Sequence, residues 1–196
     1  MRHTMRRTIH FLAFALLLPL WPAGDVDAQF NGALRGDYNM TMERFCKVRN
    51  VTTNTPKPDL HIVVRGTWNF DGSGSGTFSG QILVPDFPTV GSGLIGNQAN
   101  EACTGVYTVN SDGTFMYQPT CNLTFTAGEL GGASAVGATG SLSGIQLQGR
   151  LSLDGTVLLL SDTAVNTETL TWTSGPLNGQ VEQHECNSSG VATSRR

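Results

Sequence analysis

Cys103-Thr-Gly-Val-Tyr-Thr-Val-Asn-Ser-Asp-Gly-Thr-Phe-Met-Tyr-Gln-Pro-Thr-Cys121 is the segment with the clearest structural pattern in this chain. Two runs of alternating apolar and polar residues flank Asp112-Gly113 in it. Alternation is typical of a half-buried strand, and Asp-Gly between two such runs predicts a tight hairpin, because glycine adopts the positive φ that the turn requires. The stretch therefore predicts two paired antiparallel strands.

The same signal occurs twice more, at Asp71-Gly72 and Asp154-Gly155, so that the three turns follow one another at intervals of 41 and 42 residues. In the hairpin around Asp112-Gly113, placing Asn110 opposite Thr114 gathers the apolar residues on one face. This register predicts three cross-strand pairs: Val109 with Phe115, Tyr107 with Tyr117, and Cys103 with Cys121.

The register of the hairpin around Asp71-Gly72 is predicted in the same way. Around Asp71-Gly72, opposing Phe70 and Gly74 makes each large aromatic ring cover the space beside a glycine, which suits a curved sheet. The pairs that this register predicts are Phe70 with Gly74, Trp68 with Gly76, and Gly66 with Phe78. The third hairpin, Ile145 to Leu153 and Thr156 to Leu160, is apolar on both strands and is expected to be mostly buried.

Adding an opening strand, Leu34 to Val48, and a closing strand between Thr167 and Cys186 gives about eight antiparallel strands. No helical period of apolar residues occurs after residue 28. We therefore predict one all-β domain over residues 29–196, an antiparallel up-and-down β-barrel, which leaves no free sheet edge. The period of about 41 residues over three units also fits a β-trefoil, although the strands are long for that fold.

Residues 1–28 have the features of a secretory signal peptide. A basic start that contains Arg6 and Arg7 precedes a short apolar run ending near Trp21, and Val26-Asp27-Ala28 offers a cleavage site after Ala28. The apolar run is too short to span a bilayer, and no second one of spanning length follows. We expect export to the periplasm or the extracellular space, with no transmembrane segment in the mature chain.

The four cysteines fit that location, since disulfides persist outside the cytoplasm. The hairpin register places Cys103 directly opposite Cys121, at a separation suited to a disulfide. Elimination then pairs Cys46 with Cys186, which joins the first strand to the last. No cysteine pair has metal-binding Cys-x-x-Cys spacing, so we expect structural disulfides and no metal site.

The net charge argues against a nucleic-acid partner. Of the 12 basic and 15 acidic residues, 9 and 13 lie after residue 28, and the basic ones form no cluster. A mildly negative surface without a basic patch is unsuited to binding phosphate backbones.

Several large aromatic residues share the predicted inner face. An eight-stranded barrel is either filled by its own side chains or holds one small ligand. The number of aromatic rings favours a barrel filled by its own side chains, whereas the glycines beside the rings favour a bound ligand. If a small apolar or aromatic ligand binds, the expected lining residues are Trp68, Phe78, Tyr107, Phe115 and Tyr117.

No catalytic pattern stands out, and we expect a non-enzymatic protein without a cofactor. No Gly-x-Ser-x-Gly elbow sits between a strand and a helix. The triplet His184-Glu185-Cys186 resembles a ligand cluster, but adjacent strand residues point to opposite faces. We expect His184 and Glu185 to face solvent beside a disulfide.

The segments Gly105 to Phe115 and Leu34 to Met40, followed by a cysteine, resemble a group of small exported bacterial proteins of unknown function. In that group, Gly-x-Tyr-x-Val-x-x-Asp-Gly-Thr hairpins lie between a first-strand and a last-strand cysteine. The implied architecture is similar to lipocalin-like and allene-oxide-cyclase-like barrels. The lipocalin Gly-x-Trp signature and the cyclase catalytic pattern are absent, so the resemblance implies no activity.

Three functional hypotheses follow. The first is an exported barrel that binds a small apolar or aromatic molecule. The second is an envelope or surface structural module with a filled barrel, in which the loop from Pro85 to Asn100 binds the partner. The third is a barrel isomerase or cyclase, which would require an inward carboxylate or tyrosine at a cavity.

Overall fold

A computed structural model describes residues 30–85 and 96–195 of the chain. The expected signal peptide and most of the loop after Pro85 lie outside these residues. The strands are β1 (Arg35–Asn50), β2 (Thr55–Asp71), β3 (Ser75–Val84), β4 (Asn97–Val109), β5 (Thr114–Ala127), β6 (Glu129–Leu130), β7 (Ala133–Ser134), β8 (Thr139–Ser143), β9 (Leu147–Leu151), β10 (Val157–Ser161), β11 (Asn166–Trp172) and β12 (Val181–Ser194).

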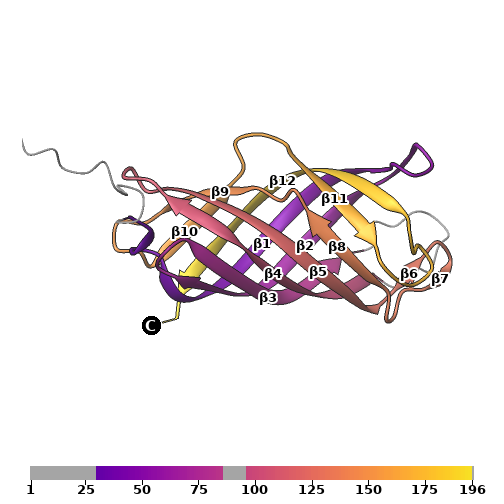
Figure 1. Ribbon diagram of the computed structural model, residues 1–196, viewed down its shortest axis with the longest axis horizontal. Helices are drawn as coiled ribbons and strands as arrows, with labels where there is room; N and C mark the ends of the chain where they lie inside the picture. Colours follow the sequence, from indigo (N-terminus) through magenta and orange to yellow (C-terminus); the bar gives the residue numbers. More distant parts are fainter. Residues whose placement is uncertain (1–29, 86–95, 196) are drawn as a thin grey trace, which may run out of the picture.

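The sheet closes on itself as an elongated barrel (Figure 1). Antiparallel pairing runs in the order β1-β2-β3-β4-β5-β8-β11-β12 and returns from β12 to β1, a ring of 8 strands. The predicted all-β, up-and-down barrel of about eight strands is confirmed, and the trefoil alternative does not apply. The predicted opening strand is β1, whereas the closing region forms a hairpin of β11 and β12.

Two sides of the barrel are built from interrupted strands. β8 and β9 follow one another along β5, separated by residues 144–146. β11 and β10 pair successively with β12 and are separated by residues 162–165. Each pair is therefore one long strand broken in its middle.

The three Asp-Gly turns meet at one end of the barrel with the segment Phe30 to Leu34 (Figure 1). Their glycines have φ values of 81°, 81° and 68°, as the turn chemistry requires. Leu34 is fully buried, and the Asn31 side chain accepts a hydrogen bond from the Val109 amide at 2.8 Å. This segment therefore packs into the end of the barrel.

The predicted register of the second hairpin is confirmed, with Tyr107 opposite Tyr117 and Cys103 opposite Cys121. The first hairpin's register is wrong by two residues, because Phe70 pairs with Gly76 and Trp68 with Phe78. The turn is longer than a tight one.

The cause of this shift is the Asp71 carboxylate, which accepts hydrogen bonds from the amides of Ser73, Gly74 and Ser75. These bonds hold the loop outside the ladder. A shift of two residues leaves every side chain on its predicted face. Phe78 still covers glycines, since a Cβ at Gly66 or Gly80 would lie only 2.6 or 2.4 Å from its ring.

Both disulfides are present, in the pairing that the register and elimination predict. Cys103 is bonded to Cys121 across β4 and β5, and Cys46 to Cys186 across β1 and β12. The second bond joins the strands at which the barrel closes.

Candidate functional site

The predicted lining residues all face the interior and are buried. They pack on one another, with ring centroids 5.7 Å apart for Trp68 and Tyr117 and 6.3 Å apart for Trp68 and Phe78. Phe70, which the sequence analysis did not include in the site, contacts four of the other rings at its centre. The buried residues of this predicted set are Trp68, Phe78, Tyr107, Phe115 and Tyr117.

Backbone carbonyls satisfy the two tyrosine hydroxyls of this set. Tyr107 donates to the Leu34 carbonyl at 2.9 Å, and Tyr117 donates to the Gly76 carbonyl at 3.1 Å. Burial and the negative charge of Glu101 raise the pKa of Tyr117. Neither phenol needs a ligand as its hydrogen-bond partner.

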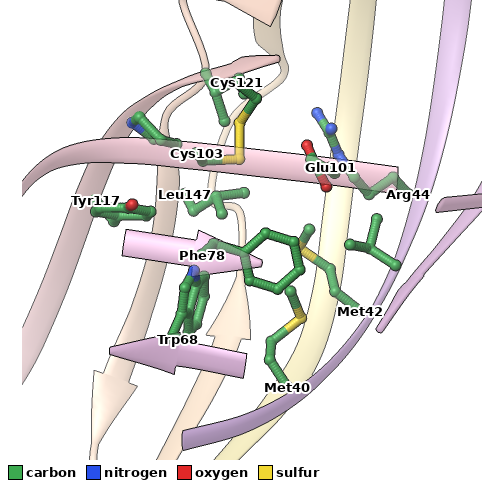
Figure 2. A pocket seen from close by; sticks show the side chains of 13 residues that line it. Met40, Met42, Arg44, Trp68, Phe78, Glu101, Cys103, Tyr117, Cys121 and Leu147 are labelled. Carbon is green, nitrogen blue, oxygen red and sulfur yellow. A yellow bond between two sulfur atoms is a disulfide. The ribbon is translucent and has the colours of Figure 1, made fainter. Parts of the chain in front are cut away.

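A small cavity lies in the barrel interior, between β1, β4 and the stretch around β9 (Figure 2). It leaves about 20 Å³ for the centres of water molecules, which is room for about one. Three of the five predicted lining residues border it, namely Trp68, Phe78 and Tyr117, while Tyr107 and Phe115 do not. It also touches Met40, Met42, Arg44, Glu101 and both cysteines of the Cys103–Cys121 disulfide.

Arg44 places a positive charge inside the barrel. It is 3% exposed, pairs with the carboxylate of Glu168 and donates from Nε to the Ser188 hydroxyl at 3.3 Å. Asn166 donates to the same Glu168 oxygen at 2.8 Å. Burial lowers the pKa of Arg44, against the charges of nearby carboxylates that raise it.

Glu101 is the second buried charge at the cavity. It is 6% exposed, and within the described part of the chain its carboxylate has neither a hydrogen bond nor an ion pair. Burial raises its pKa to about 7, and the charge of Arg44 opposes that rise. Neither Arg44 nor Glu101 was predicted from the sequence, although strand alternation puts Arg44 in line with Met42 and Cys46.

A second polar cluster lies beside the Cys46–Cys186 disulfide. Lys57 pairs with Glu182, whose other oxygen lies 3.4 Å from Nε2 of His184. Burial raises the pKa of Glu182, but the hydrogen bonds from His184 and Lys57 and the Lys57 charge outweigh it and hold the pKa near 2. The expectation that His184 faces solvent is wrong, because it shares the inner face with Cys186, whereas Glu185 is exposed.

Two groups of potential metal ligands each contain a disulfide. Cys46, His184 and Cys186 form one group, and Glu101, Cys103 and Cys121 form the other. Sulfur in a disulfide offers no thiolate, so neither group has the donors of a zinc site.

The outer surface has a larger hollow at the opposite end from the Asp-Gly turns. It has a volume of about 300 Å³ and lies over β1, β2 and β12. The pairing of β1 with β2 shifts there, between Cys46 and Val48, which bends the wall locally. We call this hollow the outer groove; it is lined by Lys47, Val48, Arg49, Pro56, Lys57, Asp59, Gln183 and Glu185.

No helix among the described residues is long and apolar enough to cross a bilayer. No protein-family model, curated protein or solved structure matches the chain. The fold and the interior are therefore interpreted from this structure alone.

Proposed function

We propose that this chain is an exported, non-enzymatic β-barrel module whose interior is a structural core and whose partners bind on the outside. The observation that carries the proposal is the filled interior. Ligand sites for small organic molecules commonly enclose about 300–1,000 Å³. The interior cavity leaves about 20 Å³, which excludes a molecule of that size unless the core rearranges.

Export is part of the proposal, with the periplasm or the extracellular space as destination. Two buried disulfides support it, because such bonds persist in oxidising compartments. Mass spectrometry of the chain recovered outside the cytoplasm is expected to find Gln29 at its N-terminus.

Fluorescence of Trp68 tests whether the interior is closed. The variant Trp172→Phe leaves Trp68 as the only tryptophan after residue 28. Titration with a lipophilic probe is expected to give no saturable quenching. Phe78→Ala, which opens space beside Trp68, serves as the positive control. Saturable quenching without that opening would support the first sequence hypothesis, a small apolar ligand, and would overturn this proposal.

The outer groove is the candidate contact surface for a partner. It offers the exposed charges of Lys47, Arg49, Asp59 and Glu185 beside one another. Crosslinking in intact cells is expected to yield one dominant macromolecular partner, and Arg49→Glu is expected to weaken that product. Arg65→Glu, on the outer face of β2 away from the groove, is the matched control. A product unaffected by Arg49→Glu would count against this surface.

The residue types that the isomerase or cyclase hypothesis requires are present, but the interior cavity is too small for a substrate. Glu101 supplies an inward carboxylate and Tyr117 an inward phenol, both at the cavity. An organic substrate does not fit a space for about one water molecule. We therefore do not favour this hypothesis.

A further inference from the structure

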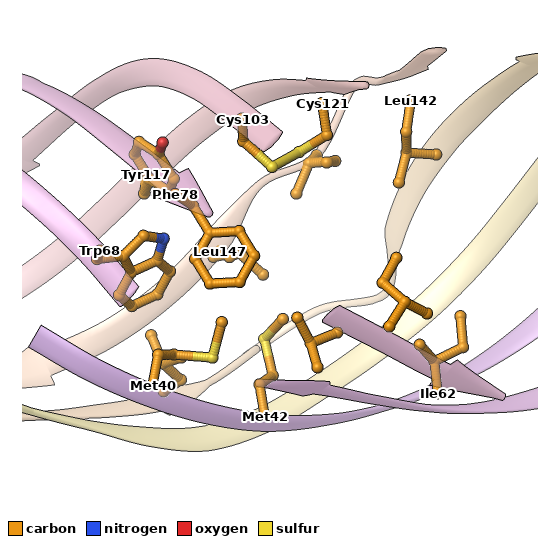
Figure 3. Close-up of a cluster of buried hydrophobic side chains, with 14 of the residues drawn as sticks. Met40, Met42, Ile62, Trp68, Phe78, Cys103, Tyr117, Cys121, Leu142 and Leu147 are labelled. Atoms are coloured by element: carbon orange, nitrogen blue, oxygen red, sulfur yellow. A yellow bond between two sulfur atoms is a disulfide. The ribbon is translucent and has the colours of Figure 1, made fainter. Parts of the chain in front are cut away.

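Two methionines stand side by side at the cavity. Met40 and Met42 occupy successive inward positions of β1 and are 3% and 4% exposed. Their cross-strand neighbours are small on at least one side: Met40 lies opposite Gly66 and Ala192, and Met42 opposite Gly190. The small neighbours leave room for long side chains, and both thioether sulfurs lie next to one another in the interior (Figures 2 and 3).

A carboxylate that makes no hydrogen bond or ion pair within the described residues borders the same space. In Figure 2, the Glu101 carboxylate lies on the side of the Phe78 ring on which the two thioethers lie. Buried polar groups almost always have a partner. Arg44 makes neither a hydrogen bond nor an ion pair with Glu101, since its guanidinium is paired with Glu168, although its charge acts on the Glu101 carboxylate.

When Glu101 is ionised, the groups around the cavity carry one more negative charge than positive charges. Arg44 and Glu168 neutralise one another, and an ionised Glu101 adds a further negative charge. Asp162, whose charge also acts on Arg44, accepts hydrogen bonds from the amides of Gln148 and Ser188. A cation would balance the excess charge.

Thioether sulfur is a soft ligand that selects Cu(I) over the hard divalent ions. The space of about 20 Å³ accommodates one monatomic ion. We propose that the cavity is a binding site for one soft monovalent cation of the Cu(I) class, held by the sulfurs of Met40 and Met42 with the Glu101 carboxylate as counter-charge. This site is independent of the outer groove.

The competing interpretation is that both methionines fill gaps in the core and that a water molecule occupies the cavity. Met116 provides an internal control. It points away from the interior on β5, and its sulfur accepts a hydrogen bond from Gln146. A site that needs the cavity requires Met40 and Met42 and does not require Met116.

The test uses Ag(I), a soft ion that needs no reductant and so leaves the disulfides intact. The exported chain is titrated calorimetrically in chloride-free buffer, and native mass spectrometry gives the stoichiometry. Ag(I) is added both to the folded chain and during refolding from urea with both disulfides left oxidised, because the side chains that line the cavity are buried. The variants are Met40→Leu/Met42→Leu, which nearly conserves core volume, Glu101→Gln, and Met116→Leu.

The proposal expects one ion per chain, with affinity lowered about tenfold or more in Met40→Leu/Met42→Leu and in Glu101→Gln, and unchanged in Met116→Leu. Circular dichroism checks that each variant is folded, and if the double variant is not, the single variants are compared instead. No bound ion after either route of addition would overturn the proposal, as would equal affinity in the double variant and the parent chain.

Discussion

At the scale of single residues, the barrel interior depends on how its buried charges are paired. Arg44 and Glu168 are almost inaccessible to solvent, and each has the other as its principal partner. Taking two charges out of water is costly, and their attraction offsets the cost only while both are present. Removing one partner should therefore cost more than removing both.

Arg44→Met leaves the Glu168 carboxylate buried without its cation, so we expect a loss of about 3–5 kcal/mol in the free energy of unfolding. Arg44→Met/Glu168→Met should recover most of that loss, since both charges are then replaced by apolar side chains. Urea unfolding followed by tryptophan fluorescence measures both values. A double variant as unstable as the single one would contradict this account of the pair.

The lowered pKa of Glu182 predicts that the free energy of unfolding depends on pH. Its pKa is about 2 in the folded chain and about 4.5 when unperturbed. A lowered folded pKa means that the ionised group stabilises the fold above pH 4.5 and that this contribution disappears as the pH falls toward 2.

Glu182→Gln is expected to cost about 1–2 kcal/mol at neutral pH, a value kept low because Lys57 is one-third exposed. The difference in melting temperature between parent and variant should shrink between pH 4.5 and 2. Thermal unfolding by circular dichroism at several pH values tests this. Melting curves that stay a constant distance apart would exclude Glu182 as the titrating group.

At the scale of elements, the broken strands need a link across their interruption. Asp162, between β10 and β11, accepts hydrogen bonds from the Gln148 amide on β9 and from the Ser188 amide on β12. Its carboxylate thus replaces ladder bonds that the broken strands do not make. The link also lies close to the ion pair of Arg44.

Asp162→Ala should lower the free energy of unfolding by about 1–3 kcal/mol, because it leaves part-buried amides without an acceptor. Hydrogen exchange should quicken at Ser188 and Gln148 first. The exchange of Phe78 and Cys103, on β3 and β4, is the internal reference, because neither strand pairs with a broken one. Uniform acceleration over the whole barrel would show that the effect is not local.

Hairpins also show what sequence could and could not predict. Asp112-Gly113 makes a tight turn, so the register of β4 and β5, including the opposed cysteines, followed from alternation alone. Gly72 to Ser75 offers several positions where the turn can end, and the local Asp71 hydrogen bonds that fix one of them do not follow from the alternation of apolar and polar residues. Face assignment survived that error because the shift was two residues.

The candidate site was predictable in its apolar part only. Aromatic residues at alternate positions identify an inner face, and Trp68, Phe78 and Tyr117 do border the cavity. Charged residues usually lie at the surface, so the residue types of Arg44 and Glu101 predict exposure. Both side chains are buried in the barrel interior instead. Strand alternation was the better guide at both positions.

At the scale of the whole molecule, two disulfides constrain the unfolded chain to different degrees. Cys46 and Cys186 are 140 residues apart, and Cys103 and Cys121 are 18 apart. Loop-closure entropy grows with the logarithm of the separation.

Cys46→Ala/Cys186→Ala should therefore cost about 5 kcal/mol, and Cys103→Ala/Cys121→Ala about 3 kcal/mol. Denaturant unfolding of the two double variants under identical conditions tests the order. A larger loss from the shorter loop would show that packing around the sulfur atoms, rather than chain entropy, determines their contribution.

Pairing of the first strand with the last has a consequence for biosynthesis. β4 and β5 can find one another as soon as both have emerged, and their disulfide can form early. The barrel cannot close until β12 has been made, so Cys46 must wait through 140 residues for Cys186 with a reactive thiol. During that interval it is open to wrong partners, and an enzyme that reshuffles disulfides would be needed most at this cysteine.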